Sequence, residues 1–193
     1  MVLTIQVFAS TSISVNPISD AIGITVQSFD SRTISEETVD AFSTYNPKSA
    51  RAIIIDLRNN NGGYIHEAIE FAALFVNNQS LIDLIDHNNT RLSVTRPNHH
   101  PYIQTNALII IIGPNTASSA EAAAYILNKH PNSIIMGKQS YGKSTIKSQS
   151  SSSSPYQSFD IKSPYIIPDI DTLFSDTDEY ESQLLHALSL IPE

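Results

Sequence analysis

The chain has 193 residues, of which 41% are hydrophobic and 16% are charged, and this composition excludes a wholly disordered polypeptide. Its net charge is −8 with only 11 lysine and arginine residues, so nucleic acid is not an expected partner. Cysteine is absent, which excludes a disulfide framework, thiolate metal sites and a cysteine nucleophile. We expect a single domain over residues 1–193, with an N-terminal strand segment at 1–20 and a core at 21–193.

The sequence contains no candidate membrane segment. Its longest apolar run, at residues 107–113, has strand length and is far shorter than the roughly 20 residues that a spanning helix needs. The first ten residues are apolar but lack the basic region of a secretory signal. We therefore predict no integral membrane segment and no signal peptide in this chain.

Strand-like and helix-like segments alternate along the chain. Runs of β-branched and aromatic residues predict strands at 3–8, 22–29, 52–57, 107–112 and 133–136. Apolar residues at helical spacing predict helices at 35–45, 64–76, 118–129 and 177–190. Three of the strands are apolar nearly throughout, as is typical of strands covered on both faces. The pattern predicts an α/β fold with a buried β-sheet flanked by helices.

Local signals refine this outline. Thr33 and Glu36 have the spacing of a capping box at the start of the first helix. Residues 86–105 and 148–158 are polar and interrupted by proline, so we expect two exposed loops. Most of the six glycines lie at strand ends, which indicates that the loops after the strands form the working end of the molecule.

Residues 137–144, GKQSYGKS, match the phosphate-binding pattern G-x-x-x-x-G-K-[ST] and follow a predicted strand. A phosphate-binding loop must open a helix, whereas this segment leads toward a serine tract and a proline. We therefore do not expect this chain to bind nucleotide.

The segment DLRNNNGG, at 56–63, is a strand end followed by polar residues and two glycines. Asp56 and Arg58 could form a structural ion pair. Alternatively, the backbone N–H groups of Gly62 and Gly63, near a helix N-terminus, could stabilise an oxyanion. Taken alone, the segment leaves both readings open.

Ser118 lies in NTASSAE, after a buried strand and at a helix start. It could be a helix cap, or a nucleophile if a neighbouring base takes its proton. A Ser-His-Asp arrangement of Ser118 with His66 and Asp56 is conceivable but has no sequence signature. No spacing of histidine with acidic residues indicates a metal site, and we expect no metal and no cofactor.

Together, DLRNNNGG, NTASSAE and GKQSYGKST resemble, in that order, the catalytic blocks of the C-terminal processing (tail-specific) serine proteases. Ser118 lies three residues before Glu121, as the family nucleophile does, and Lys143 follows it by the family's usual 25 residues. The resemblance extends from about residue 21 to the closing helix. The PDZ module that usually lies upstream of this core, or is inserted in it, is not found.

The resemblance implies a crotonase-like α/β core and a serine endopeptidase that acts through an acyl-enzyme near the C-terminal end of protein substrates. It implies that Ser118 attacks the scissile carbonyl and that Lys143 is the general base. The oxyanion would be held by Gly63 and Ser119, with Gly62 beside them. It also implies a protein or peptide substrate and a location outside the cytoplasm or at the cell surface. A noncatalytic relative that binds extended peptides or hydrophobic ligands is the alternative.

Two further expectations concern the lysines of this site. A lysine acts as a base only if burial or nearby cations favour its neutral amine, so we expect apolar strands to bury Lys143. The family often has a glutamine four residues after the lysine, where this sequence has Lys147. This departure bears on whether the enzyme is active and how strongly.

Overall fold

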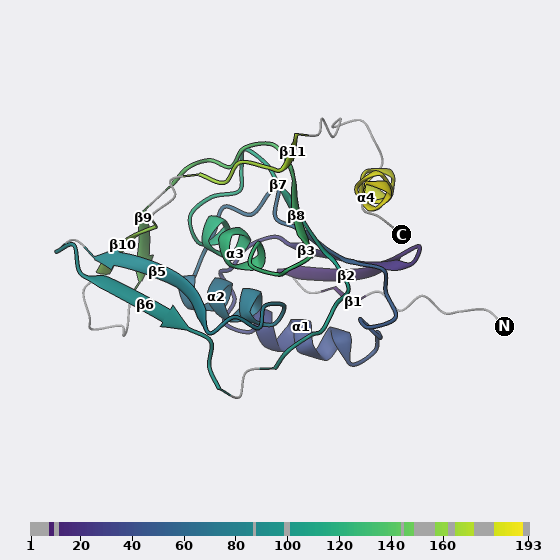
Figure 1. Ribbon diagram of the computed structural model, residues 1–193, viewed down its shortest axis with the longest axis horizontal. Coiled ribbons are helices and arrows are strands. Elements are labelled where there is room, and N and C mark those ends of the chain that lie inside the picture. The colour runs from purple at the N-terminus through teal and green to yellow at the C-terminus, as the bar shows by residue number, and fades with distance from the viewer. Residues whose placement is uncertain are drawn as a thin grey trace.

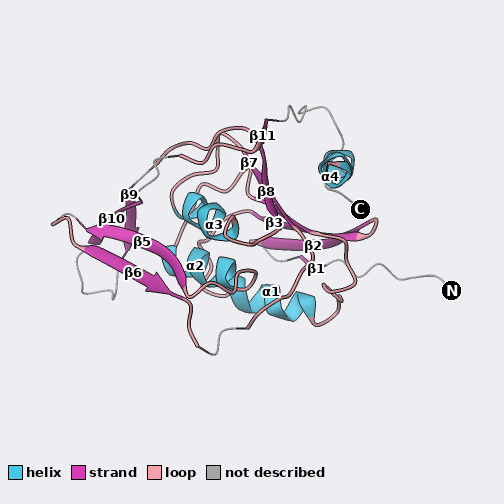
Figure 2. Cartoon of the chain, viewed as in Figure 1, coloured by secondary structure: helices cyan, strands magenta, loops and turns pink. Residues whose placement is uncertain are grey.

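A computed structural model describes residues 8–9, 12–86, 88–98, 101–143, 145–148, 157–161, 165–171 and 180–190. Its main element is a seven-stranded sheet in the order β1-β2-β3-β4-β7-β8-β11 (Figures 1 and 2). The strands of this sheet are β1 (Phe8–Ala9), β2 (Ile13–Ile18), β3 (Ala21–Val26), β4 (Ile53–Asp56), β7 (Leu108–Ile112), β8 (Ser133–Gly137) and β11 (Ile170–Asp171).

The centre of this sheet is parallel. Strands β3, β4, β7, β8 and β11 run in parallel register, while β1 and β2 join the β3 edge as antiparallel strands. The isoleucine-rich strands β4 and β7 are buried along their whole length. Continuous apolar strands of this kind need cover on both faces, so the predicted α/β sheet flanked by helices is confirmed.

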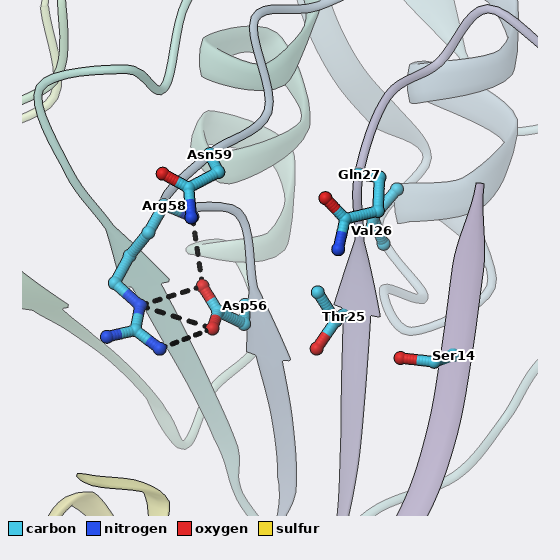
Figure 3. A pocket seen from close by; sticks show the side chains of 7 residues that line it. All are labelled: Ser14, Thr25, Val26, Gln27, Asp56, Arg58 and Asn59. Carbon is cyan, nitrogen blue, oxygen red and sulfur yellow. Dashed lines mark hydrogen bonds and ion pairs between the residues drawn. The ribbon is translucent and has the colours of Figure 1, made fainter. Parts of the chain in front are cut away.

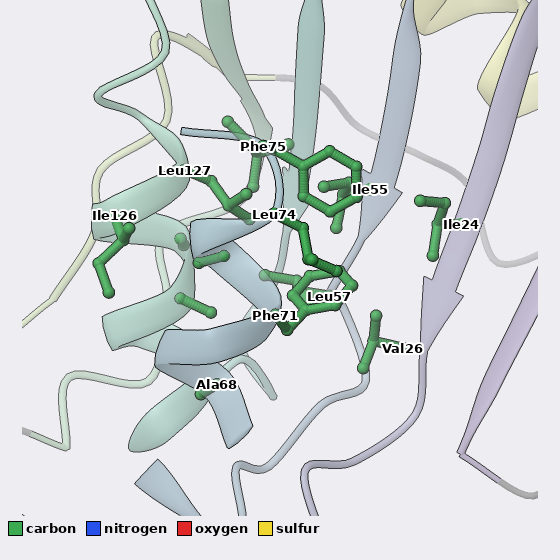
Figure 4. Packing of buried hydrophobic residues seen from close by; sticks show 14 of the residues in the cluster. Ile24, Val26, Ile55, Leu57, Ala68, Phe71, Leu74, Phe75, Ile126 and Leu127 are labelled. Carbon is green, nitrogen blue, oxygen red and sulfur yellow. The ribbon is translucent and has the colours of Figure 1, made fainter. Parts of the chain in front are cut away.

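Helices cover both faces of this sheet. On one face lie α1 (Ile34–Phe42), α2 (Ile65–Ala73) and α3 (Ser119–Leu127), and on the other lies α4 (Tyr180–Ser189) (Figure 1). Phe71, Phe75 and Leu127 pack with Ile55 and Leu57 in the larger core cluster (Figure 4). A second cluster on the opposite face joins Leu184 and Leu188 of α4 to the other side chains of the strands. Successive side chains of the strands therefore pack alternately into two hydrophobic cores, one on each face of the sheet.

A second sheet of four antiparallel strands has the order β6-β5-β10-β9 and lies beyond α2 and α3 from the main sheet (Figure 2). Its strands are β5 (Ser80–Asp86), β6 (Arg91–Thr95), β9 (Thr145–Ser148) and β10 (Gln157–Ile161). Strand β9 follows the glycine-containing loop that ends β8, so the second sheet anchors the far end of that loop.

All four predicted helices are present, and four of the five predicted strands coincide with β3, β4, β7 and β8 to within a few residues. Most of the predicted strand at 3–8 lies outside the described residues. The prediction missed β2, β5, β9 and β11, and it was wrong at 91–95 within the expected loop 86–105, where β6 forms. It was also wrong at residues 157–158, which belong to β10, while 149–156 lie outside the described residues. The predicted capping box does not form, because the Thr33 hydroxyl donates to Glu37 and makes no cap bond to the backbone.

Candidate active site

Three loops meet at one edge of the sheet. They follow β4, β7 and β8, which are adjacent parallel strands, so their carboxyl ends lie side by side. The first loop carries Gly62 and Gly63, the second Ser118, and the third Lys143. The sequence-predicted working end is therefore the edge at which ligands bind in open α/β sheets.

Ser118 occupies a strained turn between β7 and α3. Its backbone has φ 58° and ψ −123°, a region that residues with a side chain rarely adopt and that costs on the order of 1–3 kcal/mol. The side chain is partly exposed, although the residues on either side of it are buried. A sharp strand-to-helix turn of this type presents a serine hydroxyl to solvent at the top of a sheet.

The Glu121 carboxylate joins the Ser118 turn to the Lys143 loop. Oε2 accepts the backbone N–H of Ser118 and that of Lys143, each at 2.9 Å. Oε1 accepts the Gly142 N–H at 2.7 Å and the Ser140 hydroxyl at 2.5 Å. Glu121 is 2% exposed, so these bonds form in a largely water-free environment. A single buried carboxylate thus fixes the backbone of two loops that are distant in the sequence.

The two glycines of the first loop are tightly packed, Gly62 against the serine turn and Gly63 against Phe29. Gly62 has φ 105°, and a Cβ built on it would lie 3.0 Å from the Ser118 Cβ. Gly63 has φ 143°, and a Cβ there would lie 2.3 Å from the carbonyl carbon of Phe29. Both positions therefore require glycine, for conformation and for space.

The backbone N–H groups of this region differ in whether they are free to bind an oxyanion. The Gly62 N–H donates to the Asn60 side chain at 2.8 Å, so it is not available to an oxyanion. Within the described part of the chain, no hydrogen bond involves the N–H of Gly63 or of Ser119. Of the three predicted oxyanion residues, Gly63 and Ser119 thus have amides free to bind a ligand.

Asn60 explains how this loop keeps its shape. The side chain is fully buried, donates to the Val26 carbonyl at 3.1 Å and accepts from Gly62. The backbone carbonyl of Asn60 accepts the N–H of Ala117, the residue before Ser118, at 3.1 Å. Asn60 thereby connects β3, the glycine loop and the serine turn.

Lys143 does not have the predicted burial. Its side chain is exposed, and no hydrogen bond joins its amine to the Ser118 hydroxyl in the described structure. Lys143 directly follows Gly142, which has a φ of 86°. The backbone of Lys147 lies in β9 opposite Ser158, and its side chain lies outside the described structure.

Asp56 and Arg58 form the ion pair that the sequence left open as one reading. The Arg58 guanidinium donates to both Asp56 oxygens, at 2.7 to 3.1 Å, and also to Gln183 of α4. Figure 3 shows the pair beside a pocket of about 260 Å³, which is lined by Ser14, Thr25, Val26, Gln27, Asp56, Arg58 and Asn59. The pair holds the strand end from which the glycine loop starts.

The sequence model of peptidase family S41 matches residues 22–162, which is well over half of the chain. The chain belongs to peptidase family S41. It is 30% identical over 124 residues to the carboxy-terminal processing protease CtpA of Bacillus subtilis, covering 64% of this chain and 26% of that protein. It is 28% identical over 100 residues to the tail-specific protease of Haemophilus influenzae, covering 52% of this chain and 14% of that protein. The chain thus spans about a quarter or less of the length of these relatives.

Solved structures show the same fold. A lipoprotein from Streptococcus agalactiae has a TM-score of 0.72 at 19% identity, with 97% of this chain and 76% of that chain covered. The photosystem II D1 C-terminal processing protease has a TM-score of 0.63 at 18% identity, with 86% and 46% covered. These neighbours therefore share the α/β fold of this chain, a mixed sheet flanked by helices.

The structure also bears on the phosphate-binding pattern at 137–144 and on the Ser-His-Asp arrangement. After residues 137–143 the chain enters strand β9 and not a helix, so this segment lacks the geometry of a phosphate-binding loop. Within the described residues no hydrogen bond or ion pair joins His66 to Asp56; His66 lies 3.6 Å from Glu67. No group of three or more potential metal ligands was found among the described residues, and none of the described helices is long and apolar enough to span a bilayer.

Sequence reasoning missed three residues that support this family S41 site, namely Asn60, Ser140 and Gln183. It also used Glu121 only to mark the position of the nucleophile. The spacing Ser118-x-x-Glu121 before an apolar helix was a readable signal, because it is the capping-box pattern. The contacts of Glu121 with the third loop had no signal in the local sequence.

Proposed function

We propose that this chain is the catalytic core of a serine peptidase that cleaves protein or peptide substrates near their C-terminal ends. Ser118 is the nucleophile and Lys143 the general base. The N–H groups of Gly63 and Ser119 bind the oxyanion. The observation that carries the proposal is the Glu121 carboxylate, which holds both Ser118 and Lys143 by their backbone amides.

The proposed reaction has two steps. The neutral Lys143 amine takes the Ser118 proton while Oγ bonds to the carbonyl carbon, and the carbonyl oxygen becomes an anion held by the two amides. The C–N bond then breaks, and the Lys143 ammonium returns its proton to the leaving amine. Water attacks the resulting ester by the same proton route and releases Ser118. This chemistry requires no metal and no cofactor.

The exposure of Lys143 fits this proposal if the substrate completes the site. A peptide lying across Ser118 would cover Lys143 and exclude water from it, and catalytic contacts often tighten only when substrate is bound. The strained Ser118 turn and the available amides of Gly63 and Ser119 are already in place without substrate. The Lys143 amine is thus the part of the proposed site that substrate binding would have to complete.

A second candidate function rests on the same exposure. Because no hydrogen bond joins the Lys143 amine to the Ser118 hydroxyl among the described residues, the second candidate is a noncatalytic member that binds extended peptides. Such a protein would bind peptides equally well with Ser118 or with alanine at that position, and it would not cleave them.

Cleavage of an unfolded protein separates the two functions. Fluorescein-labelled casein should be degraded by the wild-type chain and not by Ser118→Ala, while both variants have the same melting temperature. Binding of casein fragments without any cleavage by the wild-type chain would favour the noncatalytic function. A location outside the cytoplasm or at the cell surface stays a proposal that rests on the family resemblance.

A further inference from the structure

Arg32, for which the described residues provide no carboxylate partner, lies over the ring of Tyr64, the residue that follows Gly63. The Arg32 guanidinium is 5.2 Å from the centre of the Tyr64 ring, and Tyr64 directly follows Gly63. The Tyr64 ring in turn lies 5.5 Å from the His66 ring. Arg32 and His66 are exposed, and Tyr64 is 41% exposed, so this stack is open to a ligand.

The loop that carries Arg32 is packed directly against the glycine loop. The Phe29 N–H donates to the Gly62 carbonyl and the Tyr64 N–H donates to the Phe29 carbonyl, each at 2.9 Å. The side chains of Ser31 and Thr33 are hydrogen-bonded at 2.7 Å, and Thr33 donates to Glu37 at 2.6 Å. These bonds fix the turn on either side of Arg32. The backbone bonds therefore hold this turn against the glycine loop, and the ring contact places the guanidinium over Tyr64, the residue after Gly63.

The charge of Arg32 is not neutralised within the described part of the chain. Arg58 and Arg91 each pair with an aspartate, whereas no ion pair involves Arg32. Asp30, two residues earlier, is exposed and forms no ion pair with it. In a chain of net charge −8, an unpaired guanidinium beside the catalytic loop stands out as a local site for an anion.

We propose that Arg32, supported by Tyr64, binds a carboxylate of the peptide substrate. This inference rests on the proposed peptidase function, because it places the anion on a peptide lying across Ser118. Tyr64 directly follows Gly63, so the Arg32–Tyr64 contact lies on the segment that leaves the proposed oxyanion site. A planar guanidinium suits a carboxylate, which it can bind through two parallel hydrogen bonds.

The carboxylate could be the C-terminus of the peptide or an acidic side chain, and three peptides distinguish these sources. Two of them share one sequence and end in a free acid or in an amide, and the third differs only in that its last residue is an amidated aspartate. Binding to Ser118→Ala is measured by fluorescence anisotropy, which requires no catalysis. It therefore tests Arg32 even if the wild-type chain fails to cleave casein.

The free acid should bind roughly fivefold to tenfold more tightly than the amide, and this ratio should fall to about one when Arg32→Gln is added. The ratio should also fall as salt rises, because the site is exposed. Lys129→Gln is the matched control: Lys129 is a cation 5.2 Å from the Tyr125 ring on α3, and its loss should leave the ratio unchanged.

A preference for the amidated aspartate that Arg32→Gln removes would support the carboxylate site and assign it to an acidic side chain. Equal binding of all three peptides would overturn the proposal. So would a preference that persists in Arg32→Gln or disappears equally in Lys129→Gln.

Discussion

Ser118 and Lys143, which are 25 residues apart in the sequence, donate their backbone N–H groups to the same oxygen of Glu121. The shared acceptor brings the strained serine turn and the lysine loop to a fixed spacing without any direct bond between their side chains. The geometry of the candidate dyad thus depends on a third residue that does not itself react.

Replacing Glu121 by glutamine tests this dependence. Each of the two carboxylate oxygens of Glu121 accepts hydrogen bonds from two donors. A glutamine has one oxygen and one NH2 group in their place, so at least one pair of donors loses its acceptor. Unsatisfied buried donors cost about 1–3 kcal/mol each, and we expect the free energy of unfolding to fall by that order. Activity on casein should fall by about a hundredfold or more, because misplaced catalytic groups lose their alignment.

Glu67→Gln is the control for that experiment, because Glu67 is also a buried glutamate, 3% exposed, on the neighbouring helix α2. It contacts neither Ser118 nor Lys143 in the described structure. We expect its activity to stay within about twofold of wild type. Equal loss of activity in both variants would show that Glu121 has no specific role in the site.

Glu67 also predicts a pH dependence of stability. Burial raises the pKa of its carboxyl, although the His66 charge and the backbone at the start of α1 act in the opposite direction. A raised pKa in the folded state means that its contribution to stability is full below the unfolded pKa and is lost as pH rises through the folded value. Urea unfolding at pH 4 and pH 8 should therefore show that Glu67→Gln gains stability relative to wild type at pH 8. No relative gain at pH 8 would contradict the argument.

Lys147 provides a test of the departure from the family pattern. A glutamine there offers a carbonyl oxygen as well as donors, whereas an ammonium offers donors alone. We expect Lys147→Gln to raise kcat/KM by up to about tenfold, the effect of one oriented hydrogen bond worth roughly 1 kcal/mol. Steady-state kinetics on a fluorogenic peptide would measure it, and a lower kcat/KM would show that Lys147 has a positive role.

Nucleotide binding is tested by thermal melting with millimolar Mg-ATP. A ligand that binds only the folded chain must raise its melting temperature by mass action, so we expect no shift. The loop at 137–143 leads into β9 and lacks the helix that a phosphate site requires. A clear shift that Lys143→Ala abolishes would contradict this expectation.

The sequence predicted the parts of the fold whose signals are local. The apolar runs of β4, β7 and β8 and the helical spacing of α2 and α3 gave their types and approximate limits. Strand β2 was missed because Asn16 and Pro17 interrupt its apolar pattern, and β6 because its five residues are mostly exposed. Strands of this kind are recognised by their pairing partners, which a single sequence does not show.

The candidate site was predictable to the same degree. The resemblance of three segments to the family's catalytic blocks predicted one site for Ser118, Gly63 and Lys143, and the strands before their loops are adjacent and parallel in the structure. The burial of Lys143 was not predictable, since it depends on how the Gly142 turn leaves the sheet. The contact between Arg58 and Gln183, 125 residues apart, likewise depends on where α4 packs.

The central claim, that Ser118 is an activated nucleophile, is tested most directly by its covalent labelling. The wild-type chain is incubated with a fluorophosphonate, and the adduct is located by peptide mass spectrometry. We predict one adduct, on Ser118, that is absent from Ser118→Ala and forms much more slowly in Lys143→Ala, while both variants remain folded. An unlabelled wild-type chain, or labelling of Ser118 at the same rate in Lys143→Ala, would contradict the account.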